Sequence, residues 1–316
     1  MTLRIRNACL ALVLVLASVG TASALEVVIR RGIEYVDHDG VKLRGDLYRP
    51  REVGKAPVLI AVHGGGWQSG SPQFYRYWGP YLAANGYAVF AIEYRLLKPG
   101  KPSYPAAVYD VKAAVQFVRA KAASLNVDPE RIGLMGDEAG AHLASLVALA
   151  GGDPIFSSEY KNAPNAATPV HVKAGVVFYG LFDLLAQWTH DQTFRPLDQI
   201  SEKFLGASPM QSRQKYFDAS PISYATLDKN KPRFQIIYGT SDEIADVNTQ
   251  SLAFLTALKQ AQFYVRKIEI PSVGNFWVSD PFSDPASPNA YTGPRLLRFL
   301  AGAFGPPDRD QPPETQ

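Results

Sequence analysis

Short apolar runs alternate with stretches of helical periodicity along most of the chain. Six runs are rich in β-branched and aromatic residues, as strands buried on both faces require. They span residues 56–63, 87–96, 131–136, 173–180, 233–239 and 264–271. Apolar residues instead recur at helical spacing in segments 104–125, 139–152, 248–260 and 294–303. This alternation predicts an α/β fold, with a mostly parallel twisted sheet and helices on both faces.

The remaining segments complete the expected organisation. Segments 27–36 and 41–50 read as two antiparallel edge strands that precede the parallel sheet. The long irregular segment 181–232 predicts a cap, or an insertion on the substrate side of the sheet. From residue 305 onward, proline and charge predict a disordered tail, 305–316. We see no internal repeat or linker, so we expect a single domain over residues 25–304.

The first residues have the pattern of an export signal. Two arginines precede an apolar run from Ala8 to about Val19, and Ala22 and Ala24 form a small-x-small cleavage pattern. This predicts a signal peptide over residues 1–24, because the run is too short for an ordinary membrane span. The alternative is an uncleaved N-terminal anchor. We therefore expect a secreted or periplasmic protein that has no membrane span after cleavage.

Charge and cysteine content narrow the function further. Cleavage would remove Arg4 and Arg6 and no acid, which lowers the formal net charge from +3 to +1. Such a balance does not favour a nucleic-acid partner, and we expect none. Cys9 is the only cysteine and lies inside the predicted signal, so the mature chain would have no disulfide or thiol chemistry. We expect no cofactor, and the sequence leaves the oligomeric state open.

Three polar motifs follow successive predicted strands. They are HGGGW at 63–67, GDEAG at 136–140 and GTSDEIAD, which contains Asp242. Open α/β sheets bind ligands at the carboxyl ends of their strands, so we expect the three motifs to meet there. Glycines in such loops let backbone N–H groups turn toward a developing oxyanion. The expected donors of this oxyanion hole are Gly65, Gly66 and Ala139.

These motifs make the chain similar to the α/β-hydrolase superfamily. Within it, the chain resembles the branch of bacterial feruloyl-esterase-like and hormone-sensitive-lipase-like carboxylesterases. The resemblance runs through nearly all of residues 33–303. It rests on the ordered stretches DGVKLRGDLYRP, PVLIAVHGGGW, GYAVFAIEYRL, YPAAVYDVKAAVQFVRA, LNVDPERIGLMGDEAGAHLA, DASPISYA and IIYGTSDEI. It implies an α/β-hydrolase fold, action on carboxylic esters, and a small ester or an acyl or aromatic molecule as ligand.

The chain departs from the family pattern at two of three triad positions. Asp242 matches the acid, but Glu138 stands where the family has serine and Asn275 where it has histidine. Serine catalysis needs an imidazole to take the proton and later to activate water. Asn275 can donate a hydrogen bond to Asp242, but it cannot accept a proton near neutral pH. The five histidines all precede Asp242, so none follows the acid as in the family: His38, His63, His142, His171 and His190.

Several roles for Glu138 remain open. It could attack a substrate as a carboxylate nucleophile, although the resulting ester would stall without a histidine. It could act as a general acid or base. It could bind a metal together with His142 and either Asp137 or His63, but packing explains His142 more simply and we expect no metal. Finally, it could occupy the donor-lined hole itself, because a carboxylate suits a helix N-terminus.

Aromatic residues near the motifs suggest a pocket. Trp67, Trp188 and Phe276 are expected to line an acyl or aromatic site, although such residues pack as often in a core. Our leading interpretation is a carboxylesterase-like protein with a disabled Ser-His-Asp triad, either a ligand-binding pseudoenzyme or a non-serine catalyst. One alternative is an active secreted hydrolase of carboxylic esters with a non-standard mechanism. Another is an interaction protein that uses its cap surface.

Overall fold

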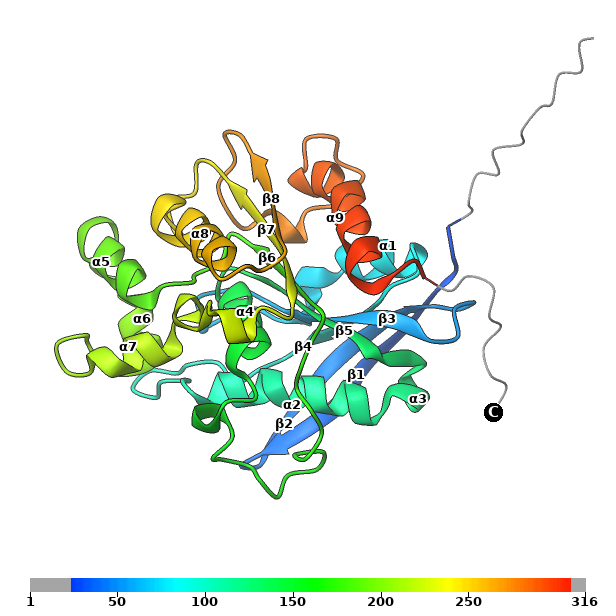
Figure 1. Cartoon of the computed structure of the whole chain (residues 1–316), viewed down its shortest axis with the longest axis horizontal. Coiled ribbons are helices and arrows are strands. Elements are labelled where there is room, and N and C mark those ends of the chain that lie inside the picture. Colours follow the sequence, from blue (N-terminus) through cyan, green and yellow to red (C-terminus); the bar gives the residue numbers. More distant parts are fainter. Residues whose placement is uncertain (1–23, 308–316) are drawn as a thin grey trace, which may run out of the picture.

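The computed structural model describes residues 24–307, and an eight-stranded sheet runs through the molecule (Figure 1). The strand order is β1-β2-β4-β3-β5-β6-β7-β8. The strands are β1 (Val27–His38), β2 (Val41–Pro50), β3 (Ala56–Val62), β4 (Ala88–Ile92), β5 (Val127–Asp137), β6 (Ala174–Phe178), β7 (Arg233–Gly239) and β8 (Val265–Ile270). The predicted signal peptide, apart from residue 24, and the tail beyond residue 307 lie outside the described residues.

The prediction of a mostly parallel α/β sheet is confirmed. Strands β3 to β8 pair in parallel, while β1 pairs with β2, and β2 with β4, in antiparallel fashion. One expectation was wrong: β2 is not an edge strand, because residues 45–48 pair with residues 89–92 of β4. Only β1 and β8 form the edges of this sheet.

Helices cover both faces of the sheet (Figure 1). They are α1 (Trp78–Ala84), α2 (Ala106–Ala120), α3 (Ala122–Leu125), α4 (Ala139–Ala150), α5 (Leu184–Phe194), α6 (Ile200–Leu205), α7 (Arg213–Ala219), α8 (Ala253–Gln260) and α9 (Pro288–Phe304). Successive residues of β3 point to opposite faces. Ile60 packs in the core that contains residues of α2 and α4, whereas Leu59 packs in the core that contains residues of α1 and α9. This two-sided burial explains the unbroken apolar run in the sequence.

Two helical regions differ from the sequence expectation. The last helix begins at Pro288, six residues before the expected start at Pro294, and the side chain of Ser287 caps it by accepting a hydrogen bond from the Asn289 N–H. The expected irregular segment 181–232 contains three short helices, α5, α6 and α7, which lie together at one side of the molecule (Figure 1). Phe204 of α6 stacks on Trp67 with ring centroids 4.3 Å apart, so this cap packs on the HGGGW loop. Across residues 24–307, no helix has the length and apolar character that crossing a membrane requires.

Candidate functional site

The turn from β5 into α4 has the form of a nucleophile elbow. Glu138 lies between the two elements with φ 48° and ψ −113°, a backbone region that non-glycine residues rarely adopt. The flanking glycines leave room for the sharp corner. A Cβ added at Gly140 would overlap the carbonyl oxygen of Val62, and one at Gly136 would overlap that of Gly140. The elbow geometry therefore persists with glutamate at its apex.

The carboxylate of Glu138 is bound by the HGGGW loop. Its Oε2 accepts hydrogen bonds from the N–H groups of Gly65 at 2.7 Å and Gly66 at 2.8 Å, and the residue is only 2% exposed. Both glycines have positive φ, which aims these donors at the elbow. Of the three expected donors, the Ala139 N–H makes no hydrogen bond to this carboxylate in the described part of the chain. A carboxylate oxygen thus lies at the two donors where a substrate oxyanion was expected.

Asp137 also holds the HGGGW loop by a hydrogen bond. Its Oδ1 accepts hydrogen bonds from the Gly64 N–H at 3.0 Å and from the Tyr75 hydroxyl at 2.8 Å, while Oδ2 has no partner among residues 24–307. Complete burial raises the pKa of the Asp137 carboxyl to about 7; the Tyr75 hydrogen bond opposes this shift, and the charge of Glu138 adds to it. Asp137 therefore has a structural role at the start of α4.

Asp242 lies in the loop that follows β7. Its Oδ1 accepts hydrogen bonds from the N–H groups of Ile244 at 2.8 Å and Ala245 at 2.9 Å. Its Oδ2 is buried and has no partner among the described residues. Burial raises the pKa of Asp242 to about 6 against the effect of these two hydrogen bonds, and the negative charge of Glu138 adds to the rise. Asp242 and Glu138 are therefore close enough to interact electrostatically.

Asn275 does not make the hydrogen bond that the sequence suggested. Its Nδ2 is buried without a partner in the described chain, as is the Oδ2 of Asp242. The two loops do meet, because the Ser241 N–H donates to the carbonyl of Val273 at 2.9 Å. The one satisfied oxygen of Asp242 is held by its own turn. Asn275 and Asp242 thus provide an unused donor and an unused acceptor at the two positions where the resemblance implies a histidine and an acid.

His190 is a neighbour of this site that the sequence reasoning missed. Gln187 of α5 donates from Nε2 to the carbonyl of Ile244 at 2.9 Å, and His190 follows one turn later. The Nδ1 of His190 is buried without a hydrogen-bond partner in the described chain and lies 3.7 Å from Oδ1 of Asp191. The fold therefore brings a histidine near the acid from the cap, against the chain order of the family.

The other two buried histidines near the elbow support packing. His63 donates from Nδ1 to the carbonyl of Gly64 at 2.8 Å, and His142 donates from Nε2 to that of Ala219 at 2.7 Å. Burial lowers the pKa of both imidazoles to about 4 against the effect of these hydrogen bonds, so both are neutral near pH 7. Among residues 24–307, no group of three or more His, Cys, Asp or Glu side chains is arranged to hold a metal ion.

The structure places the three expected pocket aromatics in different environments. Trp67 is fully buried and donates from Nε1 to Nδ1 of His142 at 3.3 Å, so it belongs to the core. Trp188 packs against that core and donates to Oε2 of Glu202 at 3.0 Å. Phe276 is 49% exposed. The three do not form one pocket wall, because Trp67 is buried by stacking on Phe204.

A large open cavity lies beside the HGGGW loop. Its volume is about 960 Å³, and Gln68, Ser69, Leu97 and Glu202 are among its lining residues. Ser69 is tied to the loop, because its N–H and its hydroxyl both donate to the carbonyl of Gly65. Glu138, Asp242 and Asn275 do not line this cavity, and Glu138 is only 2% exposed. The elbow is thus closed around its own side chain, next to open space.

The sheet, the elbow and the glycine-rich loop define this protein as an α/β hydrolase of the carboxylesterase-like class. More narrowly, the chain belongs to the BD-FAE family, which it matches over residues 45–258.

Comparison with curated proteins supports this assignment. The chain is 32% identical over 210 residues to the probable carboxylic ester hydrolase LipM of Mycobacterium tuberculosis, a match that covers 66% of this chain and 46% of LipM. It is 34% identical over 210 residues to esterase LipQ of the same organism, covering 66% and 47% of the two chains. The chain thus matches about half the length of these relatives.

Solved structures show the same fold. A thermophilic esterase, Est2 of Thermogutta terrifontis, aligns with a TM-score of 0.68 and 22% identity over 91% of this chain and 95% of its own. An acetyl ester-xyloside bifunctional hydrolase from Caldicellulosiruptor lactoaceticus aligns with a TM-score of 0.68 and 21% identity over 84% and 88% of the two chains. At this identity the likeness concerns the fold alone.

Proposed function

We propose that this protein is a ligand-binding pseudoenzyme of the carboxylesterase-like class, exported from the cell, in which Glu138 blocks its own oxyanion hole. One observation carries the proposal: the Glu138 carboxylate accepts hydrogen bonds from the backbone N–H groups of Gly65 and Gly66. Catalysis of ester cleavage requires such donors to be free for the charge that develops on the substrate. A carboxylate already bound there excludes the substrate oxygen and offers no hydroxyl nucleophile.

The lack of a base supports the same conclusion. Asn275 cannot take a proton at the position where the family has histidine, and the buried imidazoles of His63 and His142 point to backbone carbonyls. Loss of even one triad member leaves only residual catalysis. The ligand we propose is a small ester, or an acyl or aromatic molecule, because the named relatives are esterases. The 960 Å³ cavity beside the loop offers space for it.

Hydrolysis of short p-nitrophenyl esters by the purified chain tests the proposal. We expect rates near background and no labelling of residue 138 by a fluorophosphonate probe. Saturable turnover that Glu138→Gln abolishes would replace the proposal with a carboxylate mechanism. Turnover that survives Glu138→Gln would show that another site does the chemistry.

His190 favours a second candidate, a non-serine catalyst. Its Nδ1 makes no hydrogen bond within the described residues, and the helix α5 that carries it contacts the loop of Asp242, whose Oδ2 is also without a partner there. Under this alternative, any turnover of the natural chain should fall at least tenfold in His190→Gln and remain in His171→Gln, which changes a histidine of another surface. A natural chain without turnover would remove this candidate.

The cap surface favours a third candidate, an interaction protein. The five most exposed large apolar side chains of the described chain all lie within residues 181–232: Phe194, Leu197, Met210, Phe217 and Leu227. Leu197 is 93% exposed, and contact with a partner would remove this apolar surface from water. Self-association measured by sedimentation velocity should then weaken in Leu197→Asp. A chain that stays monomeric at all concentrations would count against this use of the cap in self-association.

A further inference from the structure

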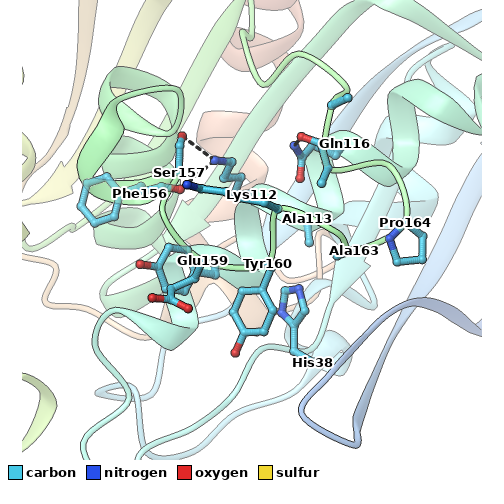
Figure 2. Close-up of a pocket in the computed structure, with 14 residues that line it drawn as sticks. His38, Lys112, Ala113, Gln116, Phe156, Ser157, Glu159, Tyr160, Ala163 and Pro164 are labelled. Carbon is cyan, nitrogen blue, oxygen red and sulfur yellow. Dashed lines mark hydrogen bonds between the residues drawn. The ribbon is translucent and has the colours of Figure 1, made fainter.

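A second, smaller space lies between α2 and the loop that joins α4 to β6 (Figure 2). Its volume is about 200 Å³, smaller than the roughly 300–1,000 Å³ typical of pockets for drug-sized ligands. Figure 2 shows Lys112 and Gln116 on one side, Ser157 beside Lys112, and His38 together with Tyr160 at the other end. Glu138, Asp242 and Asn275 do not line this space, so it is separate from the elbow.

Lys112 is a cation without a counter-ion in this space. Its Nζ donates to the carbonyl of Phe156 at 2.7 Å and to Oγ of Ser157 at 2.9 Å (Figure 2). An ammonium group has three N–H donors, so one remains available. The side chain is partly buried, burial lowers the pKa of Lys112, and no carboxylate of residues 24–307 forms an ion pair with it. A half-buried charge of this kind is stabilised when an anion approaches it.

His38 forms a rigid polar wall at the opposite end. It is 2% exposed, and its Nδ1 lies 2.7 Å from Oδ1 of Asp110. Asp110 is itself fully buried and accepts from the Arg95 guanidinium at 2.8–3.1 Å. The ring also stacks on Tyr160 with centroids 3.9 Å apart. With Nδ1 directed at Asp110, Nε2 is the ring nitrogen left for another partner.

The remaining walls are apolar and flat. Tyr109 contributes an aromatic ring, and Ala113, Ala163 and Pro164 contribute small apolar surfaces, whereas the ring of Phe156 is fully buried on the far side of its backbone. The acidic residue of the lining, Glu159, is exposed at the edge of the space, and the lining lysine Lys161 is exposed as well. The space therefore combines a cationic end with apolar sides.

We propose that this space is a binding site for a small organic carboxylate with a flat apolar body. The carboxylate would accept the free N–H of Lys112, while the body would lie against Ala113 of α2 and against Ala163 and Pro164 of the loop. The far end of the ligand would meet His38, whose orientation Asp110 fixes. This site is independent of the elbow and of the function proposed for it.

Titration of the full chain with sodium benzoate tests this inference, with benzamide as the uncharged match of the same shape. We expect saturable benzoate binding at least tenfold tighter than benzamide binding by calorimetry. Lys112→Gln keeps an N–H donor for the loop but removes the charge, so it should abolish this preference and leave benzamide unchanged. Lys98→Gln, which removes an exposed lysine that lines the 960 Å³ cavity, is the matched control and should leave both affinities as they were.

Several results would overturn the site. These are no saturable benzoate binding, equal affinity in Lys112→Gln, or a loss that follows Lys98→Gln instead. If Lys112→Gln does not fold, amide chemical shifts of the natural chain provide the readout. Benzoate should move the amides of residues 156–164 most, and shifts centred on residues 65–69 or 97–102 would place the anion elsewhere and refute the inference.

Discussion

Under the proposed function, placing serine at position 138 and histidine at position 275 should turn this protein into an esterase. In Glu138→Ser, the new hydroxyl would stand on the elbow backbone that already holds φ 48° at that position. Removal of the carboxylate would also free the N–H groups of Gly65 and Gly66, which it now occupies at 2.7 and 2.8 Å. In Asn275→His, the imidazole would find the Oδ2 of Asp242 buried and unpartnered among the described residues, ready to accept its N–H.

The expected magnitudes follow from these contacts. Each oxyanion donor in a well-studied protease contributes about 2.7–4 kcal/mol, or roughly 10²–10³ in rate. Glu138→Ser alone would regain the hole without a base, and sites of this kind retain about 10³–10⁴ over water. A positioned general base adds about 10²–10⁴ more, so the double variant should exceed the better single variant by a factor of that order. Asn275→His alone should stay at background because the hole remains filled.

The electrostatics of the site favour the repair. The charge of Glu138 now raises the pKa of Asp242, so its removal should lower that pKa below its present value of about 6. Asp242 would then be more fully ionised at neutral pH, as the orientation of a histidine requires. Activity of the double variant should rise with pH through the imidazole pKa, near 6.5 for an unperturbed histidine.

The assay is steady-state hydrolysis of p-nitrophenyl acetate and butyrate by the natural chain, both single variants, the double variant and Glu138→Ala. Glu138→Ser leaves two buried N–H groups without their partner, which costs about 1–3 kcal/mol of stability each unless water replaces the carboxylate. Thermal unfolding of each variant must therefore be measured together with its rate. Labelling of residue 138 by a fluorophosphonate should appear in the double variant. A double variant that folds, binds the ester and still turns over no faster than Glu138→Ala would show that the site geometry no longer supports ester hydrolysis.

Three further results are expected. Intact mass of the protein from its native host should show Leu25 as the first residue, and a chain that retains Met1 in exported material would contradict the predicted cleavage. Gly140→Ala should abolish soluble expression, because the added Cβ overlaps the Val62 carbonyl. Gly152→Ala, whose added Cβ makes only an ordinary contact, should melt like the natural chain. Equal melting temperatures of the two variants would contradict the tight corner at Gly140. The folded pKa of Asp137, about 7, lies above its unfolded value near 3.9, so this group's stability contribution should fall as pH rises from about 4 to 7. Asp137→Asn should reduce that slope in denaturant melts, and an unchanged slope would show that other groups cause it.

Much of the sheet was predictable because strands such as β3 are covered on both faces and carry an unbroken apolar run. The ends of elements were harder to place. Pro294 looked like a helix start because proline is common in a first turn, but the helix is capped earlier at Ser287 and Pro294 lies inside it. The sequence of β2 gives no sign of its second partner, β4, which lies more than 35 residues further along the chain, so its inner position in the sheet could not be predicted.

The site was predictable only where local spacing determines geometry. The elbow at Glu138 follows from the two glycines around it, and the donors at Gly65 and Gly66 follow from their motif. The neighbourhood of His190 depends instead on how α5 packs against the loop after β7, through the contact between Gln187 and Ile244. Such a contact joins residues 57 positions apart and leaves no periodic signal in the sequence.

The two triad substitutions that we propose, at residues 138 and 275, are physically compatible with each other. A carboxylate at position 138 is stabilised by the same donors that stabilise an oxyanion, and this offsets the strained backbone at the elbow. It also adds a negative charge near Asp242, which raises the pKa of that acid. A histidine at position 275 would face these two carboxylates, which would hold it protonated and so unable to act as a base. With Glu138 in the hole, a histidine at that position has no proton to remove, and a neutral amide there avoids burying a further charge.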